Sequence, residues 1–244
     1  MATNPMHQFE VYKIGPEINL SGINLSFTNA SLFMVISAML VISILFFGTK
    51  KKSLIPSKIQ LITEMSYTFV AKMINDTAGS SAKPFFPFIF SLFTFVLFCN
   101  MVGMLPYSFT VTSHIIVTFV LASIVFISVT ILGFAKHGFR YLELFVPKGV
   151  PIVLLPLIII IEIISYLSRP ISLSVRLFAN MMAGHTMLKV FGGFVISLGL
   201  LGGWLPLGFS VALTGLEILV AFLQAYVFAI LTCIYLNDAL NLHH

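Results

Sequence analysis

The feature that most constrains this chain is an apolar tract of 48 residues, from Val150 to Ser197. A helix of that length would extend about 72 Å, because each residue adds about 1.5 Å. The hydrocarbon core of a bilayer is only about 30 Å thick. The tract can therefore break at Arg169-Pro170 into two spans, or form a single helix that crosses the bilayer at a strong tilt.

Composition places the chain in a membrane. Hydrophobic residues make up 59% of it and charged residues 9%, against about 25% charged in soluble domains, and its mean hydropathy is +1.06. We expect an all-α polytopic membrane protein with about five membrane-embedded helices and a surface amphipathic helix. Because Cys99 and Cys233 lie in apolar runs without Cys/His ligand spacing, and no Gly-rich phosphate loop occurs, we expect no metal, cofactor or nucleotide.

The apolar runs divide the chain into six predicted segments. These are an extracytoplasmic polar tail over 1–30, a first span over 31–48, a cytoplasmic amphipathic segment over 49–83, second and third spans over 84–135, a cytoplasmic loop over 136–149, and a tilted helical hairpin over 150–244. The amphipathic segment is identified by apolar residues at helical spacing, namely Ile59, Ile62, Met65, Phe69 and Met73.

Orientation follows from the distribution of the cations in the tail and loops. If the spans alternate, all but one fall on one side of the membrane, and only Lys13 lies on the other. By the positive-inside rule the N-terminus is outside. The turn at 199–203 carries no cation, which favours an outside position, a single tilted crossing for the long tract and a cytoplasmic C-terminus. The cations on the inner side are Lys50, Lys51, Lys52, Lys58, Lys72, Lys83, Lys136, Arg140 and Lys148. Because they cluster at the ends of apolar segments, as topology requires, we expect no nucleic-acid partner.

Arg176 lies deep in the long tract. A guanidinium group cannot lose its charge at physiological pH, and placing it at membrane depth costs about 2.5–3.5 kcal/mol on insertion scales. Such a residue is expected to face a protein partner or a water-filled cavity, and to have a function.

Polar residues follow one line on each of the last two predicted helices. At 100° per residue, the members of each line fall within about 40° of one another. A hairpin closed at 199–203 would also bring His185 close to Glu217. The line on the long tract is Glu162, Arg169, Arg176 and Asn180, and the line on the last helix is Ser210, Glu217, Gln224 and Tyr235.

This pattern suggests proton transfer. Glutamate and histidine exchange protons near neutral pH when their surroundings tune them, whereas arginine does not. A polar line interrupted by one permanent cation indicates two proton paths with a barrier between them, because a continuous path would short-circuit the membrane.

Three motifs resemble subunit a of the F-type ATP synthase. The run Leu173-x-x-Arg176-Leu177-Phe178-x-Asn180-x-x-Ala183-Gly184 is similar to the family's arginine motif. The runs Leu223-Gln224-Ala225-Tyr226-Val227-Phe228 and Asn100-Met101-x-Gly103-Met104-Leu105-Pro106 resemble two further signatures, and the resemblance extends over the chain after residue 30.

The resemblance implies a membrane stator subunit beside a rotating ring of c subunits. It also implies peripheral-stalk b subunits as partners, an indirect link to the catalytic head, contact with the lipid bilayer, and no catalytic site in this chain. Two half-channels would carry protons to and from the ring and couple their flow to rotation and ATP synthesis. Arg176 would separate the half-channels and meet the ring carboxylate. The residues matching the proton pathway are Glu217, His185, Asn180, Gln224, Glu162, Ser172 and Asn100.

The chain departs from many bacterial members at one pair of positions. Those members have the acid where this chain has His185 and the histidine where it has Glu217. The exchange resembles mitochondrial-type and some alphaproteobacterial members and keeps an acid–imidazole pair. We expect the bacterial inner membrane, with the mitochondrial inner membrane as the alternative.

Two other function classes compete with this interpretation. A self-contained proton or ion transporter or channel would be expected to show internal repeats with paired broken helices, and no half-to-half symmetry is evident here. A passive membrane scaffold would not need a deep arginine flanked by Glu, His and Gln.

Overall fold

The computed structural model describes residues 9–14, 19–20, 23–24, 26–50, 56–105, 108–146 and 154–241. Within these described residues, five helices are long and apolar enough to cross a membrane, which confirms the predicted all-α membrane fold. The main helices are α1 (Asn29–Lys50), α2 (Lys58–Ala78), α3 (Phe86–Gly103), α4 (Ile115–His137), α5 (Leu155–Gly202) and α6 (Trp204–Leu240). Short 3₁₀ helices are η2 (Ser80–Phe85), η3 (Val111–Ser113) and η4 (Gly138–Phe145), and the strands are β1 (Asn19–Leu20) and β2 (Ile23–Asn24).

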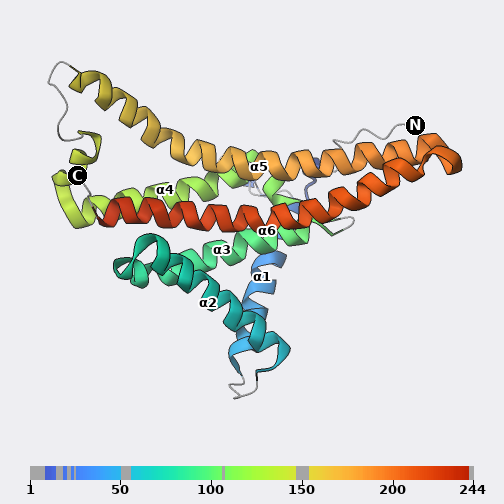
Figure 1. The fold of residues 1–244 in the computed structure, drawn as a ribbon, viewed down its shortest axis with the longest axis horizontal. Helices are drawn as coiled ribbons and strands as arrows, with labels where there is room; N and C mark the ends of the chain where they lie inside the picture. Colours follow the sequence, from blue (N-terminus) through green and yellow to red (C-terminus); the bar gives the residue numbers. More distant parts are fainter. Residues whose placement is uncertain are drawn as a thin grey trace.

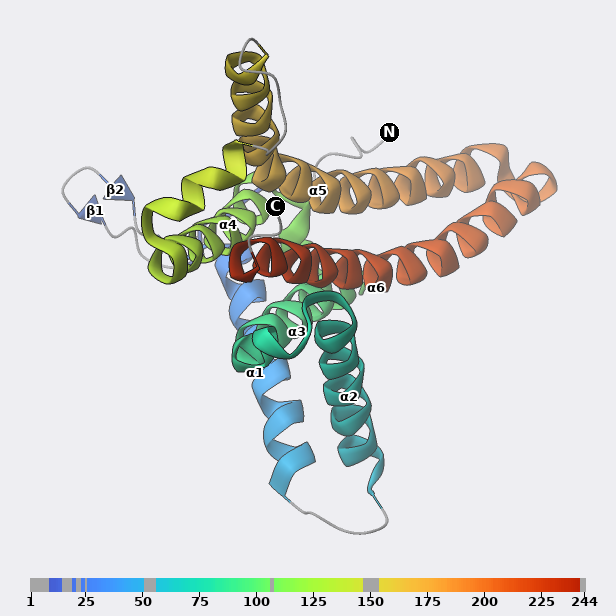
Figure 2. The same ribbon diagram turned by 60° about the vertical axis from the view of Figure 1, so that its left-hand side comes forward.

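From Leu155 onward, the long tract forms one helix. α5 runs for 48 residues and includes Pro170, so the break into two helices at Arg169-Pro170 does not occur. Figures 1 and 2 show that the first part of α5 is set at an angle to the rest of the helix. A proline removes one backbone hydrogen bond and bends a helix without having to end it.

The two longest helices form an antiparallel hairpin (Figure 1). The turn uses Gly199 at φ 63°, a conformation that glycine adopts without steric cost, and the Gly203 N–H donates to the Gly199 carbonyl at 2.9 Å. In both views the tip of the hairpin projects beyond the remaining helices.

The buried core joins α6 to α2, α3, α4 and α5. On α6 a line of small residues is fully buried: Ala221, Ala225, Ala229 and Cys233. Their four-residue spacing puts them on one helix face, and small side chains let neighbouring helices approach closely. α6 is therefore held along its buried face while its opposite face stays open.

The C-terminal ends of α4 and α6 are in contact through the Leu240 carbonyl. Lys136 Nζ donates to the Leu240 carbonyl at 3.0 Å, and the ring of His137 lies 3.2 Å from the same oxygen through Nε2. Basic side chains commonly satisfy the last carbonyls of a helix. The C-terminal end of α6 is thus on the same side of the fold as the end of α4.

Two segments contain more secondary structure than the sequence predicted, and a third keeps its apolar residues exposed. The predicted loop at 136–149 contains η4, which places Tyr141 in the core. The predicted polar tail contains the small antiparallel pair of β1 and β2. α2 and α1 lie side by side (Figure 2), yet Ile59, Ile62 and Met65 of α2 remain exposed.

The predicted cytoplasmic cations Lys51, Lys52 and Lys148, and Pro106 of the third motif, lie outside the described residues.

Candidate functional site

The α5–α6 hairpin brings His185 and Glu217 together. Nε2 of His185 lies 3.6 Å from Oε1 of Glu217, and the Glu217 side chain is only 5% exposed. Glu217 fits there because Gly184 has no side chain: a Cβ at that position would lie 2.6 Å from Oε1. The antiparallel register predicted for the hairpin is therefore confirmed for this pair.

A third residue completes this contact and was not predicted. Thr110, just before η3, has its hydroxyl 3.0 Å from Nε2 of His185 and donates toward the Gly103 carbonyl at 3.2 Å. The side chain is buried. Sequence reasoning placed this residue in the connection between two spans, and the polar run Thr110-Val111-Thr112-Ser113 was the signal that could have drawn attention to it.

Asn100 of α3 contacts α6 one helical turn beyond Glu217. Its side chain is completely buried, and Nδ2 donates to the Ala221 carbonyl at 3.1 Å. Since Ala221 follows Glu217 by four residues, it lies on the same face of α6. The structure thus brings Asn100 to the hairpin.

A second polar contact joins the hairpin farther from its tip. Nδ2 of Asn180 on α5 donates to Oε1 of Gln224 on α6 at 2.9 Å. Gln224 is buried, whereas Asn180, Arg176 and Ser172 are exposed on α5. The part of the predicted polar line formed by Arg176 and Asn180 therefore lies on an open face of the hairpin.

Among the described residues, Arg176 has no hydrogen-bond or ion-pair partner. In the part of the chain that the structure describes, no carboxylate lies at ion-pair distance from its guanidinium and no hydrogen bond reaches it. A permanent charge at membrane depth without an internal partner indicates an external one, either a partner subunit or water.

The other arginine of the α5 line is paired. Nη1 of Arg169 lies 3.1 Å from Oδ2 of Asp238 on α6. The guanidinium also lies over two aromatic rings, 5.3 Å from the centroid of Tyr166 and 5.0 Å from that of Tyr235. Both Tyr166 and Asp238 were missed, because neither residue belongs to the polar lines or motifs recognised in the sequence.

A chain of hydroxyl groups adjoins this ion pair. The Tyr166 hydroxyl lies 2.6 Å from Oγ1 of Thr130 on α4 and 3.0 Å from the Tyr141 hydroxyl on η4. The Tyr141 ring packs directly on Gly133 of α4. Glu162, one turn before Tyr166, is half-buried, and no hydrogen-bond or ion-pair partner is found for it among the described residues.

Several polar atoms around the hairpin are buried without a hydrogen-bond partner among the described residues. They include both carboxylate oxygens of Glu217, Oδ1 of Asn100 and Nε2 of Gln224. Buried polar groups are ordinarily hydrogen-bonded to protein or to ordered water, and leaving one unpaired costs about 1–3 kcal/mol. All four atoms belong to Glu217, to Gln224 or to Asn100, whose side chain bonds to α6.

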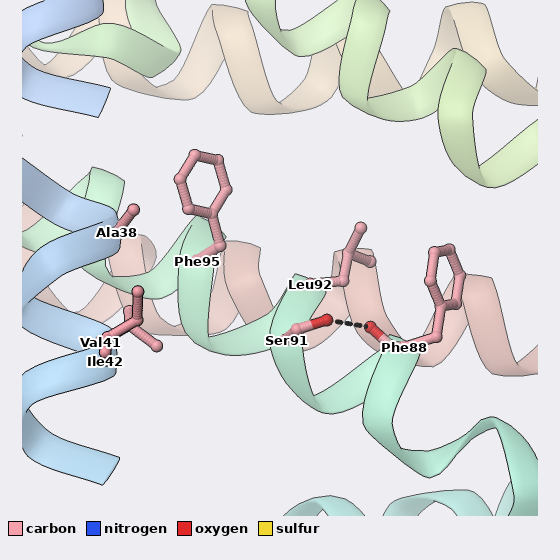
Figure 3. A pocket seen from close by; sticks show the side chains of 7 residues that line it. All are labelled: Ala38, Val41, Ile42, Phe88, Ser91, Leu92 and Phe95. Atoms are coloured by element: carbon pink, nitrogen blue, oxygen red, sulfur yellow. Dashed lines mark hydrogen bonds between the residues drawn. The ribbon is translucent and has the colours of Figure 1, made fainter. Parts of the chain in front are cut away.

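The apolar groove between α1 and α3 has a different character. Its only polar side chain, Ser91, donates to the Phe88 carbonyl of its own helix at 2.9 Å, as Figure 3 shows. The groove therefore offers no titratable group. The remaining lining residues are Ala38, Val41, Ile42, Leu92 and Phe95.

Comparison with known proteins gives consistent matches. The profile of the ATP synthase A chain family matches residues 31–237. The chain is 79% identical to ATP synthase subunit a of Pelagibacter ubique (strain HTCC1062) over 244 residues, covering 100% of both chains. It is 60% identical to ATP synthase subunit a of Chelativorans sp. (strain BNC1), covering 100% of both chains. For ATP synthase subunit a of Rhizobium rhizogenes the identity is 61%, over 99% of this chain and 98% of the relative.

Proposed function

Because this chain belongs to the ATP synthase A chain family, we propose that it is the stator subunit that provides two proton half-channels to and from a rotating ring of c subunits. As subunit a it takes part in ATP synthesis and proton transport, within a complex of F0 and F1 subunits in a bacterial membrane. We further propose which residues carry the protons and which residue separates the two half-channels.

The observation that carries the proposal is Arg176 on the open face of the hairpin. The guanidinium is exposed, and no partner for it is found among the described residues. An arriving carboxylate of a c subunit would supply the missing counter-charge, and its ionised form would be favoured beside a permanent cation. The same positive charge repels a hydrated proton, so a proton cannot pass directly from one half-channel to the other.

The outer half-channel would use the buried pair of His185 and Glu217 together with Asn100. Imidazole and carboxyl groups both accept and release protons, and they lie 3.6 Å apart here. Asn180 and Gln224, hydrogen-bonded at 2.9 Å, would carry the path toward the arginine.

The inner half-channel would use Glu162 and Ser172, which lie on the same helix as Arg176 but toward its start. Glu162 is about 21 Å from Arg176 along a straight helix, because fourteen residues separate them. It is half-buried and Ser172 is exposed, so both can meet water or a partner subunit.

The proposed orientation places the N-terminus outside and the C-terminus in the cytoplasm. The bond from Lys136 to the Leu240 carbonyl supports it, because the end of α6 then shares a side with the cationic end of α4. Peripheral-stalk b subunits and, indirectly, the catalytic head are the other proposed partners.

Energetics favour a rotary device over a single transfer step. One charge that moves through 100 mV releases about 2.3 kcal/mol. Several transfers must therefore be summed before one ATP can form, and a rotating ring performs that summation.

The test is Arg176→Ala in the assembled complex, with Arg140→Ala as the matched control because Arg140 is an exposed arginine on η4. ATP synthesis and passive proton leak are measured in inverted membrane vesicles. We expect Arg176→Ala to abolish synthesis and raise the leak, and Arg140→Ala to retain both native values. Coupled synthesis at the native rate in Arg176→Ala would refute the barrier role and return the chain to a scaffold.

A further inference from the structure

We infer that Thr110 is a positioning residue that selects the tautomer of His185 and thereby controls proton transfer between His185 and Glu217. The inference rests on the proposed function, since it concerns the outer proton path. It starts from one atom with two neighbours: Nε2 of His185 lies 3.0 Å from the Thr110 hydroxyl oxygen and 3.6 Å from Oε1 of Glu217.

The hydroxyl of Thr110 has a single proton to donate. Its other contact is the Gly103 carbonyl at 3.2 Å, and a carbonyl oxygen can only accept. When the hydroxyl proton is given to Gly103, the hydroxyl oxygen must accept from His185, so Nε2 carries a proton. The carbonyl of Gly103, at the end of α3, therefore dictates the tautomer of an imidazole on α5 through Thr110.

This arrangement keeps the histidine and the glutamate apart. A proton on Nε2 that points at Thr110 does not point at Glu217, and at 3.6 Å the two groups are beyond hydrogen-bond distance. Both carboxylate oxygens of Glu217 are buried without a partner among the described residues. Transfer of the proton to Glu217 then requires Nε2 to turn from the hydroxyl to the carboxylate, a movement of a few tenths of an ångström.

Thr110 is rigidly held for this task. The side chain is buried, and its methyl group lies against Gly103, where a Cβ would approach within 2.7 Å of it. The Thr110 carbonyl also accepts from the Ser113 hydroxyl at 2.6 Å. A fixed hydroxyl gives the imidazole a defined resting position, from which only the histidine and the glutamate need to move.

The charged and titratable groups around His185 are few. Glu217 faces it from α6, Lys189 lies one turn further along α5, and His114 is the nearest titratable group on the segment that carries Thr110. The pH response of the pair is thus governed mainly by how His185 and Glu217 share one proton.

The test compares Thr110→Val with Thr118→Val in the assembled complex. Thr118 is also buried, but among the described residues its hydroxyl bonds only to carbonyls at the start of its own helix, those of Ile115 and His114. Without the Thr110 hydroxyl, Nε2 turns to Glu217 and forms a direct pair, so the carboxylate takes up an outer proton less readily. We expect ATP synthesis to fall at least fivefold at neutral outer pH. The outer pH at which the rate is half-maximal should fall by about one pH unit, a shift of the size that a new charge pair produces.

The pair Thr110→Ser and Thr110→Ala makes the test independent of side-chain shape, since these two variants differ only by the hydroxyl. Serine should restore the native pH profile and alanine should reproduce the acid shift. If Thr118→Val shows the same shift, or if serine fails to restore the profile, the role of Thr110 is packing and the inference is wrong. A native profile in Thr110→Val and Thr110→Ala would also overturn it. Even if the Thr110 inference fails, a loss of coupled ATP synthesis in Arg176→Ala would still support the proposed function.

Discussion

The Glu217 carboxylate of α6 lies directly against the backbone of Gly184 on α5. A Cβ atom at Gly184 would come 2.6 Å from Oε1 of Glu217 and 2.9 Å from its Cδ. Real Cβ atoms do not approach other atoms so closely, so any side chain at this position would push the carboxylate aside. The glycine of the arginine motif thus makes room for an acid that is 33 residues away in the sequence.

We therefore expect Gly184→Ala to reduce ATP synthesis by tenfold or more while the complex still assembles. The displaced group is the end of a flexible side chain, so the helices need not separate. Gly192→Ala on the same helix is the matched control, because nothing lies within 4 Å of a Cβ there. Synthesis rates and subunit composition of the purified complexes are the measurements. Equal rates in the two variants would show that ATP synthesis does not depend on the position of the Glu217 carboxylate beside Gly184.

The hydrogen bond between Asn180 and Gln224 predicts coupled effects on proton transport. We expect Asn180→Leu and Gln224→Leu each to slow ATP-driven proton pumping, and the double variant to be only slightly slower than either. Both single changes remove the same contact, whose energy for polar pairs within membranes averages about 0.6 kcal/mol. Pumping rates of the four complexes give the coupling. If the rate reductions of the two single variants simply multiply in the double variant, the 2.9 Å hydrogen bond does not contribute to proton pumping.

The ion pair between Arg169 and Asp238 predicts a change in stability. Its side chains are 22% and 36% exposed, so solvent screens the attraction and we expect a coupling of about 0.5–1 kcal/mol. Arg169→Gln and Asp238→Asn should each lower the thermal unfolding midpoint of the complex by a few degrees, and the double variant should lose no more than the worse single variant. A double variant that loses the sum of both would contradict the pairing.

Gly133 predicts a packing effect near the C-terminal end of α4. A Cβ at this position would overlap the Tyr141 ring, so Gly133→Ala should push η4 away from α4 and cost about 1–3 kcal/mol, as overpacking usually does. The adjoining hydroxyl contact between Tyr141 and Tyr166 would be lost. The measurement is the unfolding midpoint of the complex. Adding Tyr141→Leu to Gly133→Ala should recover part of the loss, and a native midpoint in the single variant would count against this packing.

Hydrophobic patterning alone determined the membrane class and the number of apolar helices. Long apolar runs can bury their backbone polar groups in a bilayer only as helices or closed barrels, and 18-residue or longer runs fit helices. The cation-free glycine turn at 199–203 also indicated the hairpin and its register. The sequence could therefore pair His185 with Glu217, because each lies 16 residues from the midpoint of the turn and the rise per residue is fixed.

Tertiary structure decided the contacts that join segments distant in the sequence. Periodicity along one helix says nothing about which neighbour covers it, so Thr110 against His185 and Asn100 against Ala221 appeared only when α3, η3, α5 and α6 were packed together. The continuity of α5 through Pro170 was likewise undecided in the sequence, because a proline can either bend or end a helix. Local chemistry fixed the helices and the charge at Arg176, and packing fixed which polar groups lie in contact.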